Sequence, residues 1–212
     1  GVGRLLADLE RNGELANTLV VFTSDNGASR EGELVGTTAY YVHLLAGDDI
    51  DATLVFVRTK TATVELAERS YPIRIGRGSA GFVSFLTPLV QGRLALLAHD
   101  ARLGTQAQNL ADQLIQAGWR VGLYAVPSGE ASKSGQHLQS LWTTLANLPA
   151  DRSTGVIALG GGVVGDLAGF AAANFNRGLP LVMIPTTLLS MVDSSVGGKT
   201  GINLPEGKNL VG

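Results

Sequence analysis

Short apolar runs alternate with longer amphipathic stretches through most of this 212-residue chain. The apolar runs predict buried strands at 93–98, 120–126, 156–159 and 181–184. Apolar residues at three- and four-residue spacing predict helices at 80–90, 106–117, 133–148, 163–174 and 187–192. Strands that alternate with helices are typical of a parallel sheet covered on both faces. The pattern therefore predicts an α/β fold of the Rossmann-like kind.

The first 52 residues form a separate unit in this pattern. A helical stretch is followed by the strand-like run TLVVFT at 18–23 and by the polar loop Ser24-Asp25-Asn26-Gly27. Asp25 and Asn26 at a strand tip could ligate a hard cation, although an ordinary Asn-Gly turn explains the same residues. After a junction at 53–60, residues 63–75 have the alternation of a β-hairpin. The domain prediction is therefore 1–52, then a junction, then 61–212.

Composition narrows the possible functions. The net charge of −2 gives no electrostatic basis for binding nucleic acid or an anionic membrane surface. With no cysteine, the chain has no disulfide or thiolate metal site, and we expect a cytoplasmic protein. No apolar run is long enough to cross a bilayer, and GVGRLLADLERNG does not fit a signal peptide. The chain starts with glycine and stops inside a motif, so we expect both ends to be internal to a longer sequence.

A glycine-rich turn follows the strand predicted at 156–159. Gly160, Gly162 and Gly165 fit the spacing of a dinucleotide-binding turn between a strand and a helix. Glycine allows a backbone to approach a phosphate closely, and a helix N-terminus carries roughly half a positive charge. However, no acidic residue lies between Asp166 and Asp193 to bind the ribose, which disfavours an ordinary Rossmann dehydrogenase. A P-loop is also excluded, because Asp193 stands where its first glycine would be.

Residues from about 61 to 212 resemble the 3-dehydroquinate synthases, a family of sugar-phosphate cyclases. The resemblance rests on GGGVVGDLAGF at 160–170, RGLP at 177–180, PTTLL at 185–189, VDSSVGGKTGIN at 192–203 and GKN at 207–209. It implies that this region is the NAD-binding domain of the family, here truncated. It also implies that the full-length protein is a homodimer with a helical C-terminal domain that binds zinc or cobalt.

The resemblance also implies a set of site residues. It assigns NAD contacts to Asp100, Ser128, Gly129, Glu130, Lys133, Gly161, Gly162, Val163, Gly165, Asp166, Thr186, Thr187, Lys199 and Lys208. It assigns catalytic roles to Asp193, Lys199, Lys208, Asn209 and Arg177, the last of these reaching the substrate of a neighbouring subunit. Arg102 departs from the family pattern, which usually has asparagine there, and this change bears on the choice between NAD and NADP.

Structural explanations exist for several of these residues. Ser132 could cap a helix that leaves Glu130 and Lys133 exposed, and Thr186 could cap the next helix. Arg177 could be a surface residue at a helix end. The histidines His43, His99 and His137 lack the spacing of metal ligands, and we expect them to be structural or superficial.

The family reaction converts 3-deoxy-D-arabino-heptulosonate 7-phosphate to 3-dehydroquinate and phosphate, in the shikimate pathway of aromatic amino acid biosynthesis. The resemblance implies a phosphorylated sugar acid as substrate and NAD as a catalytic cofactor that is unchanged overall. The implied metal ligands would follow Gly212. We therefore expect the 212 residues to bind NAD without cyclising the substrate.

Residues from about 1 to 52 resemble a different family, the sulfatases. In that family an Asp-Asn pair helps to hold the active-site metal, which would place this role on Asp25 and Asn26. The family's nucleophile motif C/S-x-P-x-R does not occur here, so we interpret the pair as vestigial. Three alternatives to a dehydroquinate synthase remain open. They are a sulfatase, another sugar-phosphate cyclase or glycerol-dehydrogenase relative, and a sulfatase–cyclase chimera that acts only as an NAD-binding module.

Overall fold

The computed structural model describes residues 38–43, 60–65, 67, 70–76, 79 and 81–212. Within these residues one seven-stranded sheet has the order β2-β3-β1-β7-β6-β4-β5. Its strands are β1 Thr38–His43, β2 Lys60–Val64, β3 Tyr71–Gly76, β4 Leu94–Asp100, β5 Arg120–Val126, β6 Gly155–Gly160 and β7 Leu181–Pro185. All neighbouring strands are parallel except the pair β2 and β3.

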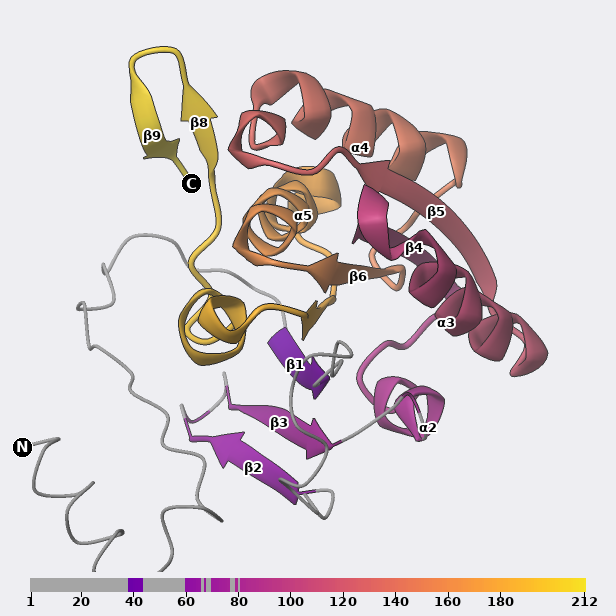
Figure 1. Cartoon of the computed structure of the whole chain (residues 1–212). Coiled ribbons are helices and arrows are strands. Elements are labelled where there is room, and N and C mark those ends of the chain that lie inside the picture. Colours follow the sequence, from indigo (N-terminus) through magenta and orange to yellow (C-terminus); the bar gives the residue numbers. More distant parts are fainter. Residues whose placement is uncertain (1–37, 44–59, 66, 68–69, 77–78, 80) are drawn as a thin grey trace, which may run out of the picture.

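Helices cover both faces of the sheet (Figure 1). They are α2 Phe82–Leu86, α3 Gly104–Gln116, α4 Gly135–Asn147 and α5 Gly162–Asn174, with short 3₁₀ turns at Ala101–Leu103, Glu130–Ser132 and Phe175–Arg177. Alternate residues of one strand point to opposite faces. In β6, Val156 and Ala158 therefore pack with α4 and α5, whereas Ile157 and Leu159 pack with α2 and α3. The predicted α/β fold with helices on both faces is confirmed.

Several element boundaries differ from the sequence predictions. Helix α4 begins at Gly135 and is capped by Ser134, whose Oγ accepts from the backbone N–H of His137 at 3.5 Å. The alternative in which Ser132 caps this helix is therefore wrong, because Ser132 is buried in the preceding 3₁₀ turn. The helix predicted at 187–192 contains a wider, π-type segment at Ser190–Ser194. The sequence analysis also missed the hairpin of β8 Ile202–Leu204 and β9 Gly207–Val211.

Most of the predictions for the first 52 residues concern residues that the structure does not describe. The helix of the first residues, the strand TLVVFT, Asp25 and Asn26 lie outside the described residues. Of the segment 1–52, the structure describes only β1, which pairs with β3 on one side and with β7 on the other. Among the described residues, no helix has the length and hydropathy of a membrane span.

The strand order contains a change of direction beside β4. From β4 the chain proceeds to β5 on one side, then crosses back to β6 on the other side and continues outward to β7. Loops that leave two adjacent parallel strands in opposite directions open a crevice at the carboxyl ends of those strands. In this sheet the crevice lies where β4 ends at Asp100 and β6 ends at Gly160.

Candidate functional site

The site is built from segments that follow the carboxyl ends of parallel strands. Strand β4 delivers Asp100, β5 leads into the loop 127–134, β6 leads into the glycine turn, and β7 delivers Thr186 and Thr187. The strands are in register, so Asp100 lies opposite Val126 and Gly160 lies opposite Pro185. Residues separated by up to 87 positions in the sequence are therefore placed at one edge of the sheet.

The glycine turn leaves little room for side chains. Gly161 is the N-cap of α5 and forms no side-chain cap, so the first N–H groups of this helix lack the usual capping acceptor. A Cβ atom on Gly161 would lie 3.3 Å from Thr187 Cγ2, and one on Gly162 would lie 3.2 Å from Ser194 Oγ. The turn therefore combines uncapped backbone donors with a close approach to the β7 loop, which fits the binding of a pyrophosphate.

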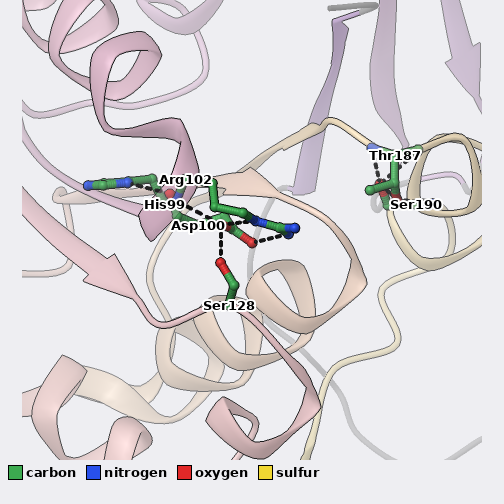
Figure 2. A network of polar contacts seen from close by, with 6 residues as sticks. All are labelled: His99, Asp100, Arg102, Ser128, Thr187 and Ser190. Carbon is green, nitrogen blue, oxygen red and sulfur yellow. Dashed lines mark hydrogen bonds and ion pairs between the residues drawn. The ribbon is translucent and has the colours of Figure 1, made fainter. Parts of the chain in front are cut away.

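Asp100 is the centre of one hydrogen-bond network (Figure 2). Its Oδ1 accepts from the backbone N–H of Arg102 at 2.9 Å, from Arg102 Nε at 3.0 Å and from Ser128 Oγ at 2.7 Å, while Oδ2 accepts from Arg102 at 2.9 Å. Hydrogen bonds from Arg102 and Ser128 outweigh partial desolvation and hold the pKa of Asp100 well below its usual range. The carboxylate is thus ionised, and the Arg102 side chain is its main partner.

A second network lies around the buried ammonium of Lys133. Its Nζ donates to Asp166 Oδ2 in α5 and to Asn209 Oδ1 in β9. Asn203 adds two further links, because its backbone N–H donates to the Lys133 carbonyl at 2.8 Å and its side-chain Nδ2 donates to Glu130 Oε1 at 2.8 Å. The structure therefore joins the loop after β5, the start of α5 and the β8–β9 hairpin through one lysine.

The alternative in which Lys133 is exposed is wrong, since only 4% of this residue is accessible, but Glu130 is exposed as that alternative expects. Gly129, just before them, has a φ of 110°, a conformation that favours glycine. Burial raises the pKa of Asp166, and the Lys133 ammonium opposes this shift. The carboxylates of Glu130 and Asp193 raise the pKa of Asp166 further, which places all three acids in one electrostatic neighbourhood.

The segment after β7 is held by reciprocal capping. The Thr187 backbone N–H donates to Ser190 Oγ and the Ser190 N–H donates to Thr187 Oγ1, each at 3.2 Å (Figure 2). Thr187 therefore serves as the cap that the sequence analysis had considered for Thr186. The Thr186 backbone N–H instead donates to the Gly160 carbonyl at 2.9 Å, which ties the β7 loop to the glycine turn.

Most of the remaining predicted site residues lie outside the two hydrogen-bond networks of Asp100 and Lys133. Asp193, Lys199 and Lys208 are exposed on the segments between β7 and the end of β9. Asn209 is exposed as a whole residue, but its φ of 55° is left-handed and its side chain reaches Lys133. Val163 and Gly165 lie in the first turn of α5. Arg177 lies after the far end of α5, beside the start of β7, and so is separated from the glycine turn by the length of that helix.

Sequence reasoning missed three residues of this region. Asn203 bonds to Glu130 and accepts from the backbone N–H of Asn209 at 2.9 Å. Ser190 is buried as the partner of Thr187, and the Tyr71 hydroxyl accepts from the Gly197 N–H at 3.2 Å. Asn203 and Ser190 stand inside or beside the motifs quoted above, which was a usable signal, but Tyr71 is 126 positions from Gly197 and gave none.

The two described histidines outside β1 make hydrogen-bond contacts within the fold. His99 is buried, and its Nδ1 lies 2.8 Å from the backbone carbonyl of Asp100. His137 Nδ1 lies 3.0 Å from the Tyr124 hydroxyl. In the part of the chain that the structure describes, no group of three or more His, Asp or Glu side chains could hold a metal ion.

Comparisons with known proteins give two separate matches. Residues 123–212 match the family described as 3-dehydroquinate synthase N-terminal, and residues 1–63 match the sulfatase family. A 3-dehydroquinate synthase of Rhodopirellula baltica is 52% identical over 157 residues, covering 70% of this chain and 42% of the relative. One of Pseudomonas savastanoi is 51% identical over 154 residues, covering 72% and 41%. The chain thus spans about two fifths of the length of these curated relatives.

Solved structures give a consistent fold. A 2-deoxy-scyllo-inosose synthase complexed with carbaglucose-6-phosphate, NAD⁺ and Co²⁺ superposes with a TM-score of 0.66 at 29% identity, over 72% of this chain and 42% of that one. A 2-epi-5-epi-valiolone synthase from Streptomyces hygroscopicus with NAD⁺ and Zn²⁺ has a TM-score of 0.54 at 31% identity, over 60% and 36%. Both solved structures are similar to this chain in fold over those shares of its length.

Proposed function

We propose that the region from about residue 61 to 212 is the NAD-binding part of a 3-dehydroquinate synthase, because residues 123–212 match the N-terminal part of that family and a curated relative is 52% identical over 157 residues. The observation that carries the proposal is the glycine turn at the crevice between β4 and β6. There the start of α5 has no side-chain cap, so its backbone N–H groups would be donors for a ligand. A dinucleotide pyrophosphate is the ligand that suits this arrangement.

The surrounding residues suit the rest of a dinucleotide. Asp100 and Ser128 would lie beside the adenosine ribose, and Thr186 and Thr187 beside the nicotinamide end. Gly161, Gly162, Val163 and Gly165 would receive the pyrophosphate, and Glu130, Lys133 and Asp166 would support the ribose on the other side. NAD, when bound, supplies a reversible acceptor for a hydride from a substrate carbinol.

The proposed substrate is 3-deoxy-D-arabino-heptulosonate 7-phosphate, and the proposed product is 3-dehydroquinate. Asp193, Lys199, Lys208 and Asn209 lie on segments that follow β7, and their exposed polar groups would bind and orient this substrate. Lysines suit a phosphate as mobile point charges. Arg177, at the other end of α5, could reach a substrate only in a second copy of the chain, so its role requires the proposed homodimer.

A divalent metal does not fit the described residues, which bring no suitable cluster of side chains together. The expected behaviour of the 212 residues is NAD binding without release of phosphate from the heptulosonate phosphate. Phosphate release by the purified chain with NAD and added Co²⁺ would contradict that expectation.

The sharpest test uses the cap position of α5. In Gly161→Asp, a carboxylate would accept the free N–H groups of the first turn and repel a pyrophosphate, while Asp is a favourable cap for the helix. We expect NAD⁺ affinity, measured by calorimetric titration of the 212-residue chain, to fall by more than about 30-fold without loss of thermal stability. Gly161→Ala adds the same Cβ without the charge and should lose much less affinity.

Two results would overturn the proposal. One is the absence of any saturable NAD⁺ binding to the unmodified chain at millimolar concentration. The other is an equal loss of affinity in the two variants, since this would mean that only the added Cβ matters and the helix donors do not.

The nearest alternative is that the chain belongs to a sugar-phosphate cyclase with a different substrate. The superposed structures are synthases of 2-deoxy-scyllo-inosose and 2-epi-5-epi-valiolone, but their identity to this chain is 29% and 31%. The curated 3-dehydroquinate synthases reach 52%. The higher identity favours the dehydroquinate reaction, and competition between candidate sugar phosphates for the NAD-loaded chain would distinguish these substrates.

A further inference from the structure

Most lone pairs of the Asp100 carboxylate already accept hydrogen bonds from the protein itself. Three donors converge on Oδ1 and one on Oδ2, and three of these four hydrogen bonds come from Arg102 (Figure 2). A carboxylate oxygen has about two lone-pair directions, so Oδ1 has no place for a further donor. Only Oδ2 retains room for a ribose hydroxyl.

This arrangement changes the charge that a ligand meets at the tip of β4. A free carboxylate at a dinucleotide site accepts from the ribose 2′-hydroxyl and repels a 2′-phosphate, whereas a nearby arginine accommodates that phosphate. Here the carboxylate and the guanidinium are paired at 2.9 Å and their charges cancel. The repulsion that would exclude a 2′-phosphate is therefore removed.

The two side chains differ in their exposure to solvent. The Arg102 side chain is 75% accessible and that of Asp100 only 11%. An approaching anion therefore meets the guanidinium before the carboxylate. Nε and one terminal nitrogen of Arg102 bind Asp100, and the other terminal nitrogen keeps donors for a ligand.

We infer that Arg102 determines cofactor specificity by allowing the adenosine end of the pocket to accept a 2′-phosphate, so that the chain binds NADP⁺ as well as NAD⁺. The inference rests on the proposed function, because it concerns the same dinucleotide site. It predicts dissociation constants for NAD⁺ and NADP⁺ that agree within about tenfold at low ionic strength.

The test is a calorimetric titration of the 212-residue chain with NAD⁺ and with NADP⁺. In Arg102→Asn we expect NADP⁺ to bind at least about tenfold more weakly, because a charge-assisted hydrogen bond is lost and Asp100 becomes an unpaired anion. NAD⁺ should bind as well or better, because Asp100 regains lone pairs for the ribose. Arg120→Asn is the matched control. It removes the same charge at the start of β5, and the parallel strands β4 and β5 begin at the opposite end of the sheet from Asp100.

A second variant covers the case in which Arg102→Asn does not fold. Arg102→Lys keeps the charge but cannot bind Asp100 through two nitrogens, so it should retain binding of NADP⁺. Added salt should weaken NADP⁺ binding to the unmodified chain more than NAD⁺ binding.

The outcomes separate the two proposals. If NAD⁺ binds but NADP⁺ binds more than about 100-fold more weakly, the inference is overturned while the proposed function stands. An unchanged NADP⁺ to NAD⁺ ratio in Arg102→Asn also overturns it, as does a ratio that shifts equally in Arg120→Asn. If neither dinucleotide binds, both proposals are wrong.

Discussion

At the scale of single residues, two ion pairs of similar chemistry have different consequences. The Asp100–Arg102 pair is local in sequence and its arginine is 75% accessible, so solvent weakens its contribution to stability. The Lys133–Asp166 pair spans 33 positions, and its side chains are only 5% and 18% accessible. The first pair therefore bears mainly on the charge at the proposed dinucleotide site, and the second on how the segments are held together.

Asp100 should make the chain sensitive to acid. Its pKa is lowered in the folded state, so between that value and about 4 the unfolded chain binds more protons, and stability falls as the pH drops. We expect Asp100→Asn to be less stable than the unmodified chain at pH 7, with a difference that shrinks towards pH 3. Urea midpoints measured across this range test the prediction, and a difference independent of pH would contradict it. Asp166, whose pKa is raised, contributes with the opposite sign.

Lys133→Met should destabilise the chain by about 3 kcal/mol, because it leaves the carboxylate of Asp166 buried without its cation. The free energy of unfolding in urea measures this cost. The double variant Lys133→Met/Asp166→Leu is the control, since it removes both charges and should recover part of the loss. Asp166→Leu is measured alone as well, and a double variant whose loss equals the sum of the two single losses would show that Lys133 and Asp166 are not coupled.

Residue types were easier to predict than the contacts they make. The motifs identified Lys133, Asp166 and Asn209 as site residues, yet the local sequence alone favoured a solvated Lys133. The burial of Lys133 decides between a site role and a solvated side chain. This burial depends on the β8–β9 hairpin, where Asn209, 76 positions after Lys133, accepts from its ammonium. A long-range contact of this kind leaves no trace in local hydropathy.

At the scale of elements, Gly165 and Gly169 of helix α5 have different surroundings. A Cβ on Gly169 would lie 2.4 Å from Thr200 Cγ2 and 3.3 Å from Leu181 Cδ2, whereas one on Gly165 would meet nothing closer than Met183 Sδ at 3.7 Å. Gly169 thus permits the close packing of α5 against β7 and the segment that leads to β8. Gly165 lacks such a steric reason within the chain.

We expect Gly169→Ala to lower the free energy of unfolding by about 1–3 kcal/mol through overpacking. Gly165→Ala is the matched variant in the same helix, and it should be neutral or stabilising by up to about 1 kcal/mol, because alanine favours a helix. Chemical denaturation of the two proteins measures both effects. A loss of equal size in both would show that helix propensity or a shared backbone change, rather than the contact with Thr200, controls stability here.

The buried strands and the longer helices were predictable because their apolar periodicity is strong. β5 was predicted at its observed bounds, and α3 and α5 within two residues at each end. The hairpin β8–β9 was missed because its residues are mostly polar or exposed and Asn209 is left-handed. Its short strands are joined by the residues Pro205 and Glu206, which lie between the two quoted motifs and were not interpreted as a turn.

At the scale of the whole molecule, the order of the strands determines where a ligand can bind. β4 is buried along all seven residues and pairs with β5 on one side and β6 on the other. The crevice beside it brings Asp100 and the glycine turn to one edge, although neither motif alone specifies a neighbour. Sequence reasoning could predict that a parallel sheet exists, but the position of β4 within it depends on the crossover that follows β5.

The central position of β4 has a consequence for synthesis on the ribosome. The edge of β4 that pairs with β6 has no partner until about 60 further residues have been added, between the ends of the two strands at Asp100 and Gly160. At about 5–20 residues per second, this takes on the order of 3–12 seconds. During this interval LALLAHD, apolar over its first five residues, presents an open strand edge to other nascent chains. We therefore expect the strand order that forms the proposed dinucleotide crevice also to favour aggregation of the nascent chain until β6 has been made.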